Sequence, residues 1–385
     1  MKTPVYLDYN ATTPVDKRVL ETMLPFFTEQ FGNAASSNHQ YGWAAAEAVT
    51  IAREQIARLI GAVKEEIVFT SGATESINLA IRGVADAYAT KGNHIITCAT
   101  EHKAVLDTCA ALSKKDMEIS FLRVDKKGSI NIDELKQTIK PSTILICLMY
   151  ANNETGVLFP VREIADAAKQ NNVLFFCDAT QAVGKAAVNV LDDGIDLMAF
   201  SSHKLYGPKG CGALYVRRKN PRVRLKEQIT GGGHERTMRS GTLNVPGIVG
   251  FGKAAELCMK ESANDAKQIR LLRDHLEYSI CKQTVTTVNG EVKNRLPHVS
   301  NLCFHLQNGA SFMAELSKYM AVSSGSACSS ASPEPSHVLK AMGLTDEEIK
   351  SSVRFSLGRF TTEVEINYTI KQITHVLKQL KNPGL

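Results

Sequence analysis

Hydrophobic and polar positions along the first two thirds of the chain predict strands that alternate with helices. Short apolar runs predict strands at 66–70, 94–98, 120–124, 143–149, 174–177 and 197–200. Apolar residues at helical spacing predict helices at 15–30, 44–60, 77–90, 132–139 and 161–170. Because strands separated by helices form a mainly parallel sheet, this part of the chain is expected to be α/β.

The pattern changes after a glycine-rich stretch at 231–242. Beyond it, we expect helices at 249–259, 269–280, 309–320 and 363–380, with strands at 285–288, 299–305 and 351–357. This mixture predicts a smaller α+β domain. We therefore expect a large domain at 14–258 and a small domain formed by 1–13 and 259–385.

One segment of the small domain differs from its surroundings. Residues 323–333 are almost all small or polar, so they can bury little apolar surface. We expect them to form a mobile loop.

Polar clusters follow five of the predicted strands. They lie at 71–76, 102, 153, 178–181 and 201–204. In a parallel sheet the ligand lies beyond the carboxyl ends of the strands, which share one edge. The five clusters are therefore expected to form a single site.

The stretch Met-Ala-Phe-Ser-Ser-His-Lys at 198–204 places Lys204 directly after a strand, and Gly207 and Pro208 then close a turn. A lysine in this position can reach into a cleft. When it is partly desolvated it acts as a neutral amine, which suits a lysine that holds pyridoxal phosphate (PLP) covalently. The alternative is an exposed turn lysine.

Two further features bear on that choice. PLP chemistry also needs a carboxylate that keeps the pyridine nitrogen protonated and a cradle for the phosphate. Asp178 ends a predicted strand, and Gly72, Ala73 and Thr74 begin a helix, where unpaired amides and the helix dipole favour an anion. Taken singly, Asp178 could cap a turn and 72–74 could be a plain helix start. Together with Lys204 they favour a PLP site.

Composition bears on the kind of ligand, the metal content and the cellular location of the protein. The chain has 385 residues with 45 Lys and Arg against 39 Asp and Glu, and this small positive excess does not favour nucleic acid as the main ligand. Its nine cysteines include no C-x-x-C pair and no metal-ligand spacing, so we expect reduced thiols, no metal site and a cytoplasmic location. Neither a membrane-spanning run nor a targeting segment is expected.

Motifs along the whole chain resemble one known family. They include Phe-Thr-Ser-Gly-Ala-Thr-Glu-Ser at 69–76, Ser-His-Lys-Leu-Tyr-Gly-Pro-Lys-Gly at 202–210 and Ser-Ser-Gly-Ser-Ala-Cys-Ser-Ser-Ala-Ser at 323–332. Further matching motifs lie at 6–14, 100–105, 151–156, 178–181, 231–236 and 353–360. In these segments the chain resembles the cysteine desulfurases of the NifS/IscS type, within the class V aminotransferases.

The resemblance implies a homodimeric, PLP-dependent transferase of fold type I with a seven-stranded, mainly parallel sheet. It implies conversion of L-cysteine to L-alanine, with the sulfur passed through an enzyme persulfide to acceptor proteins for iron-sulfur cluster assembly or thiolation. A selenocysteine lyase or another class V transaminase is the alternative.

The resemblance also implies roles for individual residues. Lys204 would hold the cofactor and move the Cα proton, and His102 would stack on the cofactor ring and assist that transfer. The remaining cofactor contacts would come from Asp178 at the pyridine nitrogen, Gln181 and Asn153 near the phenolic oxygen, Ala73, Thr74, Ser201 and His203 at the phosphate, and Thr242 of the neighbouring subunit.

Two residues would act on the substrate. Arg354 would bind the carboxylate of cysteine, near Asn153, because a guanidinium matches a carboxylate with two hydrogen bonds. Cys328 would attack the substrate sulfur and carry the persulfide. Two departures from the family stand out, namely Ala34 where a proline is usual and a short C-terminus after 380, which leaves the acceptor protein open.

Overall fold

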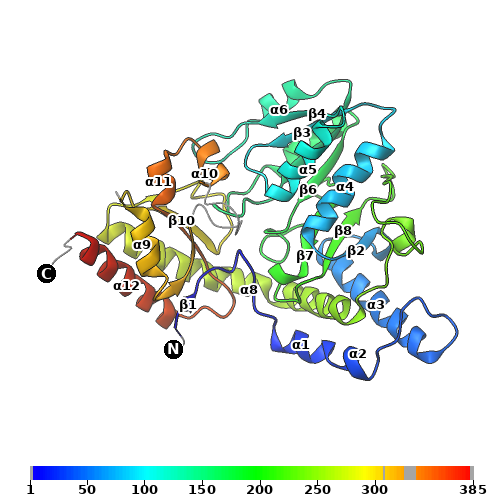
Figure 1. The fold of residues 1–385 in the computed structure, drawn as a ribbon, viewed down its shortest axis with the longest axis horizontal. Helices are drawn as coiled ribbons and strands as arrows, with labels where there is room; N and C mark the ends of the chain where they lie inside the picture. The colour runs from blue at the N-terminus through cyan, green and yellow to red at the C-terminus, as the bar shows by residue number, and fades with distance from the viewer. Residues whose placement is uncertain (1–2, 307, 325–334, 382–385) are drawn as a thin grey trace.

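The computed structural model describes residues 3–306, 308–324 and 335–381. Its largest sheet has the strand order β2-β8-β7-β6-β5-β3-β4 (Figure 1). These strands are β2 (Ile67–Thr70), β3 (His94–Cys98), β4 (Glu118–Leu122), β5 (Thr143–Met149), β6 (Leu174–Asp178), β7 (Leu197–Ser201) and β8 (Gly212–Val216). Only β8 pairs antiparallel with its neighbours in this sheet, so β2 and β7 on either side of it run the same way. The predicted seven-stranded, mainly parallel sheet is confirmed.

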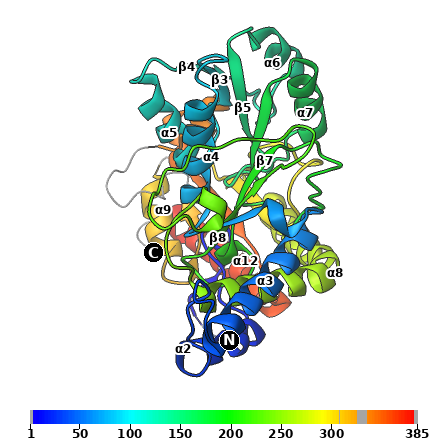
Figure 2. The ribbon, with the colours of Figure 1, turned by 90° about the vertical axis from the view of Figure 1, so that its right-hand side faces the viewer.

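Helices cover both faces of this sheet (Figure 2). They are α3 (Gln40–Leu59), α4 (Ala73–Ala87), α5 (Lys103–Ser113), α6 (Ile132–Thr138) and α7 (Val161–Gln170). In β5, Leu145 and Cys147 pack into one core with α4 and α5, whereas Ile146 and Leu148 pack into the other with α3 and α7. Because successive side chains of a strand point to opposite faces, a strand buried on both sides must be apolar throughout. This is why these strands appear in the sequence as continuous apolar runs.

A smaller antiparallel sheet lies beside the first (Figure 1). It contains β12 (Ser323–Ser324), β13 (Ser352–Ser356), β10 (Val299–Cys303) and β9 (Thr287–Val288), and a separate pair joins β1 (Val5–Tyr6) to β11 (Met320–Ala321). The helices of this part are α9 (Gly309–Leu316), α10 (His337–Ala341), α11 (Asp346–Lys350) and α12 (Glu363–Lys381). Phe312 of α9, Phe355 of β13 and Ile373 of α12 share its core.

The structure corrects several predicted elements. The helix expected at 15–30 is divided into α1 (Lys17–Met23) and α2 (Pro25–Thr28), because Pro25 lacks the N–H that would continue the hydrogen-bond ladder. The helix expected at 309–320 ends at Leu316, because Met320 and Ala321 pair with β1 instead. Short 3-10 turns occupy η1 (Lys64–Glu66), η2 (Ser202–Lys204) and η3 (Glu235–Thr237).

The largest correction concerns α8 (Val245–Gln283), a continuous helix of 39 residues where two separate helices were expected. The polar stretch at 260–268 contains neither glycine nor proline, so its polarity reflects exposure to solvent and does not break the helix. α8 crosses the position expected to separate the domains, and the domain division at 258 stays a prediction. Within the described residues, no helix is both long and apolar enough to cross a membrane.

An ion network joins the end of β13 to α8 and to the N-terminal segment. The Arg359 guanidinium lies 2.7 Å from Asp265 and 3.2 Å from both Asp16 and Glu261. It also lies over the ring of Tyr206 at 4.6 Å, and the backbone N–H of Arg359 donates to the Tyr206 hydroxyl at 2.7 Å. One side chain thus holds three segments that are distant in sequence.

We predict that Arg359→Ala destabilises the protein by about 3 kcal/mol, because the partly buried Asp265 loses its ion-pair partner and the Tyr206 ring loses its cation, whereas Asp16 and Glu261 keep Arg18. The measurement is a urea titration followed by circular dichroism. Arg359→Lys is the matched control, since it keeps the charge but loses the planar fork, and it should lie between the alanine variant and the wild type. Equal midpoints for all three proteins would contradict this role.

Candidate active site

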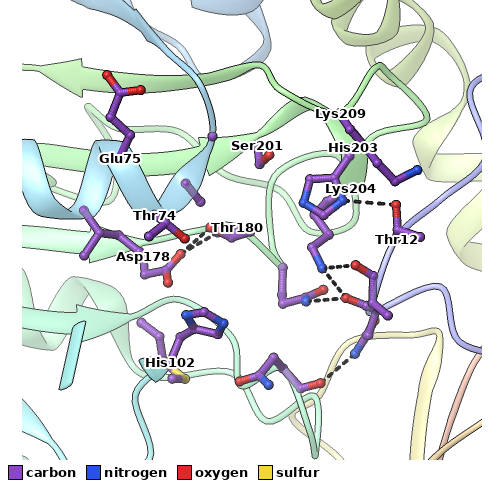
Figure 3. A pocket seen from close by; sticks show the side chains of 18 of the residues that line it. Thr12, Thr74, Glu75, His102, Asp178, Thr180, Ser201, His203, Lys204 and Lys209 are labelled. Carbon is purple, nitrogen blue, oxygen red and sulfur yellow. Dashed lines mark hydrogen bonds between the residues drawn. The ribbon is translucent and has the colours of Figure 1, made fainter. Parts of the chain in front are cut away.

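A cavity of about 560 Å³ lies at the carboxyl ends of β2, β3, β5, β6 and β7 (Figure 3). All five polar clusters predicted from the sequence contribute to its wall. The predicted site residues that line it are Ala73, Thr74, His102, Asn153, Asp178, Gln181, Ser201, His203, Lys204 and Arg354. Apart from Arg354, which lies on β13 of the smaller sheet, these residues converge because the parallel strand directions bring their strand ends to one edge.

Lys204 lies in η2, directly after β7, and its side chain is buried, so the alternative of an exposed turn lysine is wrong. The Nζ donates to the main-chain carbonyl oxygens of Asn10 and, at 2.7 Å, Ala11. These carbonyls come from the N-terminal segment that follows β1. The amine is therefore held inside the cavity by a distant part of the chain.

Asp178 ends β6 and is 7% exposed. Its Oδ1 accepts hydrogen bonds from the amide and the hydroxyl of Thr180, at 3.0 and 2.5 Å. Both bonds go to the same oxygen, and Figure 3 shows the carboxylate beside the cavity with His102 across from it. Asp178 can therefore present its other oxygen to a cationic ring nitrogen.

The N-terminus of α4 forms another part of the wall. Its N-cap residue is Gly72, which has no side chain to cap the first turn, so the amides of Ala73 and Thr74 remain available at the cavity. Uncapped amides and the helix dipole bind an anion. Ser201 and His203 line the same cavity, and burial, followed by the charge of nearby Lys204, lowers the pKa of His203 to about 4.

His102 is the N-cap residue of α5, and its Nδ1 accepts a hydrogen bond from the Ala104 amide at 3.1 Å. The hydrogen of a neutral ring must then lie on Nε2. The surrounding protein lowers the pKa of His102 mainly by desolvation, although its side chain is accessible through the open cavity. At neutral pH the ring can therefore stack on a flat ligand without adding a positive charge.

Arg354 reaches the cavity from β13 of the smaller sheet. Its NH2 bonds to Asp8 Oδ1 at 2.7 Å and to Ser323 Oγ at 2.9 Å, and NH1 donates to the carbonyl of Asn153 at 2.9 Å. The Nε is buried and has no hydrogen-bond partner in the described part of the chain. A buried guanidinium with an unused donor suits an incoming carboxylate.

Two predicted site residues are not part of this wall. Thr242 is exposed and does not line the cavity of its own chain, so its place in the site of a neighbouring subunit stays a prediction. Cys328 lies outside the described residues. Of the loop expected at 323–333, the structure describes Ser323 and Ser324, and these pair with β13 as strand β12.

Sequence reasoning assigned no role to several residues of the wall, namely Asn10, Thr12, Glu75, Thr180 and Lys209. Glu75 and Thr180 lie inside the predicted clusters at 71–76 and 178–181, and Lys209 lies in the motif at 202–210. Asn10 and Thr12 belong to the motif at 6–14. That motif was the one feature of the sequence that could have placed Asn10 and Thr12 in the site. No chemical pattern pointed to the main-chain carbonyl of Asn10.

The residues present fit PLP, because the buried amine, the strand-end carboxylate and the uncapped helix start surround one cavity. Fold and site together define a pyridoxal-phosphate enzyme of fold type I. The chain belongs to the family described as Aminotransferase class-V, which matches residues 5–368.

Named relatives agree with this assignment. A "Cysteine desulfurase IscS" of Anaeromyxobacter sp. (strain Fw109-5) is 53% identical over 382 residues, covering 99% of this chain and 94% of the relative. A solved "NIFS-LIKE PROTEIN" matches with a TM-score of 0.91 and 37% identity, over 98% of this chain and all of the other. A structure titled "SspA in complex with cysteine" matches with a TM-score of 0.83 and 37% identity, over 93% of this chain and all of the other. The family resemblance expected from the motifs is confirmed.

Proposed function

We propose that this protein is a PLP-dependent cysteine desulfurase, which converts L-cysteine to L-alanine and transfers the sulfur to Cys328 as a persulfide. The observation that carries the proposal is the position of Lys204, buried after β7 in one cavity with Asp178 and the start of α4. The relative named above as a cysteine desulfurase, and the similar structure titled as a complex with cysteine, support the choice of substrate. Sulfur-acceptor proteins, such as an iron-sulfur scaffold, would then receive the persulfide sulfur.

The residues of the cavity divide the work of holding the cofactor. Ala73, Thr74, Ser201 and His203 would bind its phosphate. Asp178 would pair with the pyridine nitrogen, and Lys204 would hold the cofactor covalently until the substrate amine replaces it. When bound, the cofactor withdraws electrons from the substrate Cα and so weakens the bonds around it.

Lys204 and His102 would carry out the proton transfer at the substrate Cα. After its release, the Lys204 amine would take the proton from Cα. His102 would lie against the cofactor ring and assist this transfer through its Nε2. Arg354 and Asn153 would hold the substrate carboxylate and so orient Cα toward the lysine.

Cys328 would supply the attacking sulfur. Its thiolate would form an S–S bond with the substrate sulfur while the carbon–sulfur bond of the substrate breaks, and protonation of the carbon would give alanine. The eight cysteines that the structure describes are poor competitors, because burial raises the pKa of each thiol above its ordinary value. They are free thiols, which supports a reducing, cytoplasmic location.

We also propose that the protein is a homodimer. The segment from α2 to the start of α3 exposes large apolar side chains, with Phe27 58%, Phe31 64%, Tyr41 54% and Trp43 56% exposed. Several such residues close in sequence indicate a surface that another chain covers. Thr242, exposed at the end of the glycine-rich stretch, would then enter the partner's site.

The test of the proposed function uses purified protein, PLP and L-cysteine without any keto acid. We expect a yellow protein that forms alanine and a persulfide, a Lys204→Ala variant that forms neither, and a Cys328→Ser variant that stays yellow but also forms neither. A colourless wild type that takes up no added PLP would falsify the proposal. Alanine formed at the wild-type rate by Cys328→Ser would refute the role of that cysteine.

A second prediction concerns the substrate carboxylate. Arg354→Ala should raise the KM for cysteine roughly ten- to hundredfold, the loss expected for a hydrogen bond between charged groups. Steady-state kinetics measures this change, and the visible spectrum of bound PLP should remain. Arg354→Lys retains the charge without the fork and should recover part of the loss. Unchanged KM in the alanine variant would count against this role.

A third prediction concerns the dimer. Sedimentation should show a dimer, and Thr242→Ala should weaken PLP binding. Co-expression of Thr242→Ala with Lys204→Ala chains should form mixed dimers in which one site combines an intact Lys204 with the intact Thr242 of the partner subunit. Recovery of tight PLP binding at that site is the expected result, whereas an active PLP-saturated monomer would refute the proposal.

A further inference from the structure

A second lysine lies behind the cavity wall. Lys185 lies shortly after the polar cluster at 178–181, and its Nζ donates to Gln181 Oε1 at 3.2 Å. Gln181 is buried and lines the main cavity, whereas Lys185 lines a separate small cavity of about 30 Å³. Gln181 therefore lies between Lys185 and the space proposed for the cofactor.

The contacts of Gln181 define the orientation of its amide. Its Nε2 donates to the main-chain carbonyl of Asn10 at 3.0 Å, and a carbonyl can only accept. Its Oε1 accepts from the Lys185 Nζ at 3.2 Å. The Asn10 carbonyl already excludes the flipped amide, in which the amide oxygen would face that carbonyl.

Asn10 is itself held in place. Its Nδ2 donates to the Asn153 carbonyl at 2.9 Å, its Oδ1 lies 2.7 Å from His298 Nε2, and its N–H donates to Ser356 Oγ at 2.9 Å. Because Nδ2 is used as a donor, Oδ1 must accept and His298 must donate. The same Asn10 carbonyl that receives Gln181 also receives Lys204. The two side chains thus share one buried, well-anchored acceptor.

The Gln181 amide nitrogen carries two hydrogens, and the Asn10 carbonyl uses one. The other is available to the cavity that Gln181 lines. We propose that Lys185 is a positioning residue, which holds Gln181 Oε1 so that an amide N–H of Gln181 faces the anionic phenolic oxygen of bound PLP. This inference rests on the proposed function for the presence of that cofactor.

The cost of placing Lys185 here supports a role beyond packing. Burial, followed by the charge of Lys204, lowers its pKa to about 7. An ammonium at this position is therefore disfavoured relative to water, and an apolar side chain of similar length would avoid that penalty. The alternative, in which Lys185 only stabilises its turn, predicts lower stability without any change at the cofactor.

The experiment compares Lys185→Met, Lys185→Arg and the exposed control Lys260→Met, each stripped of PLP and titrated with it. We expect Lys185→Met to raise the Kd for PLP roughly tenfold, as for one lost hydrogen bond to a charged oxygen, and to move the pH at which the visible band of bound PLP changes. Lys185→Arg keeps a donor and should recover part of both effects, and Lys260→Met should match the wild type. A lower thermal midpoint with unchanged PLP titration and spectrum would overturn the proposal.

A double-mutant cycle shows whether Lys185 acts through Gln181. In a Gln181→Ala background, Lys185→Met should cause no further change in the Kd for PLP. An equal change in both backgrounds would mean that Lys185 acts without Gln181 and would overturn the proposal.

Gln181→Glu provides evidence if Lys185→Met does not fold. A glutamate can still accept from Lys185 but has no N–H for the Asn10 carbonyl or for the cavity, so PLP binding should weaken, and circular dichroism checks that the fold is kept. Tight binding in this variant would contradict the proposal. Failure of the two proposals can be told apart. If the wild type itself takes up no PLP, the proposed function is wrong. If the wild type binds PLP and Lys185→Met binds it equally well, only the role of Lys185 is wrong.

Discussion

The structure depends on the burial of its central strands on both faces. With α4 and α5 on one side and α3 and α7 on the other, no side chain in the middle of β5, β6 or β7 meets solvent. Polar groups are costly there unless they are paired, so the chemistry must lie at the strand ends. The parallel directions of β2, β3, β5, β6 and β7 then bring their carboxyl ends to one edge, which concentrates reactive side chains in a single cavity.

The N-terminal segment completes this cavity from outside the sheet. The amide and hydroxyl of Thr13 both donate to the carbonyl of His203, at 3.0 and 2.9 Å, and Asn10 and Ala11 accept from Lys204. Asp8 of the same segment bonds to Arg354 in the smaller sheet. A short stretch after β1 therefore links Lys204, the lysine proposed to hold the cofactor, to Arg354, the arginine proposed to bind substrate, although the two follow or belong to strands of different sheets.

Electrostatics in the cavity follow from the same burial. The lowered pKa values of His102 and His203 keep both rings neutral at neutral pH, so the positive charge near the cavity comes from lysine and arginine. Burial, and then the charge of Asp178, raises the pKa of Glu101, which accepts from the Met149 amide at 2.7 Å. The raised pKa disfavours a second negative charge at Glu101, close to Asp178, the residue proposed to pair with the pyridine nitrogen.

The sequence by itself determined the α/β class, the strands from β2 to β7 and most of the cavity wall, because apolar runs followed by polar clusters are local patterns. It also placed Lys204 and Asp178 at strand ends, where their chemistry could be inferred. Local patterns could not reveal that α8 continues through a polar stretch, since an exposed helical face and a break look alike in sequence. Only the tertiary structure decided that Asn10 and Arg354 meet at Asn153, and that Lys185 holds Gln181, because contacts between distant segments arise from the packing of the two sheets.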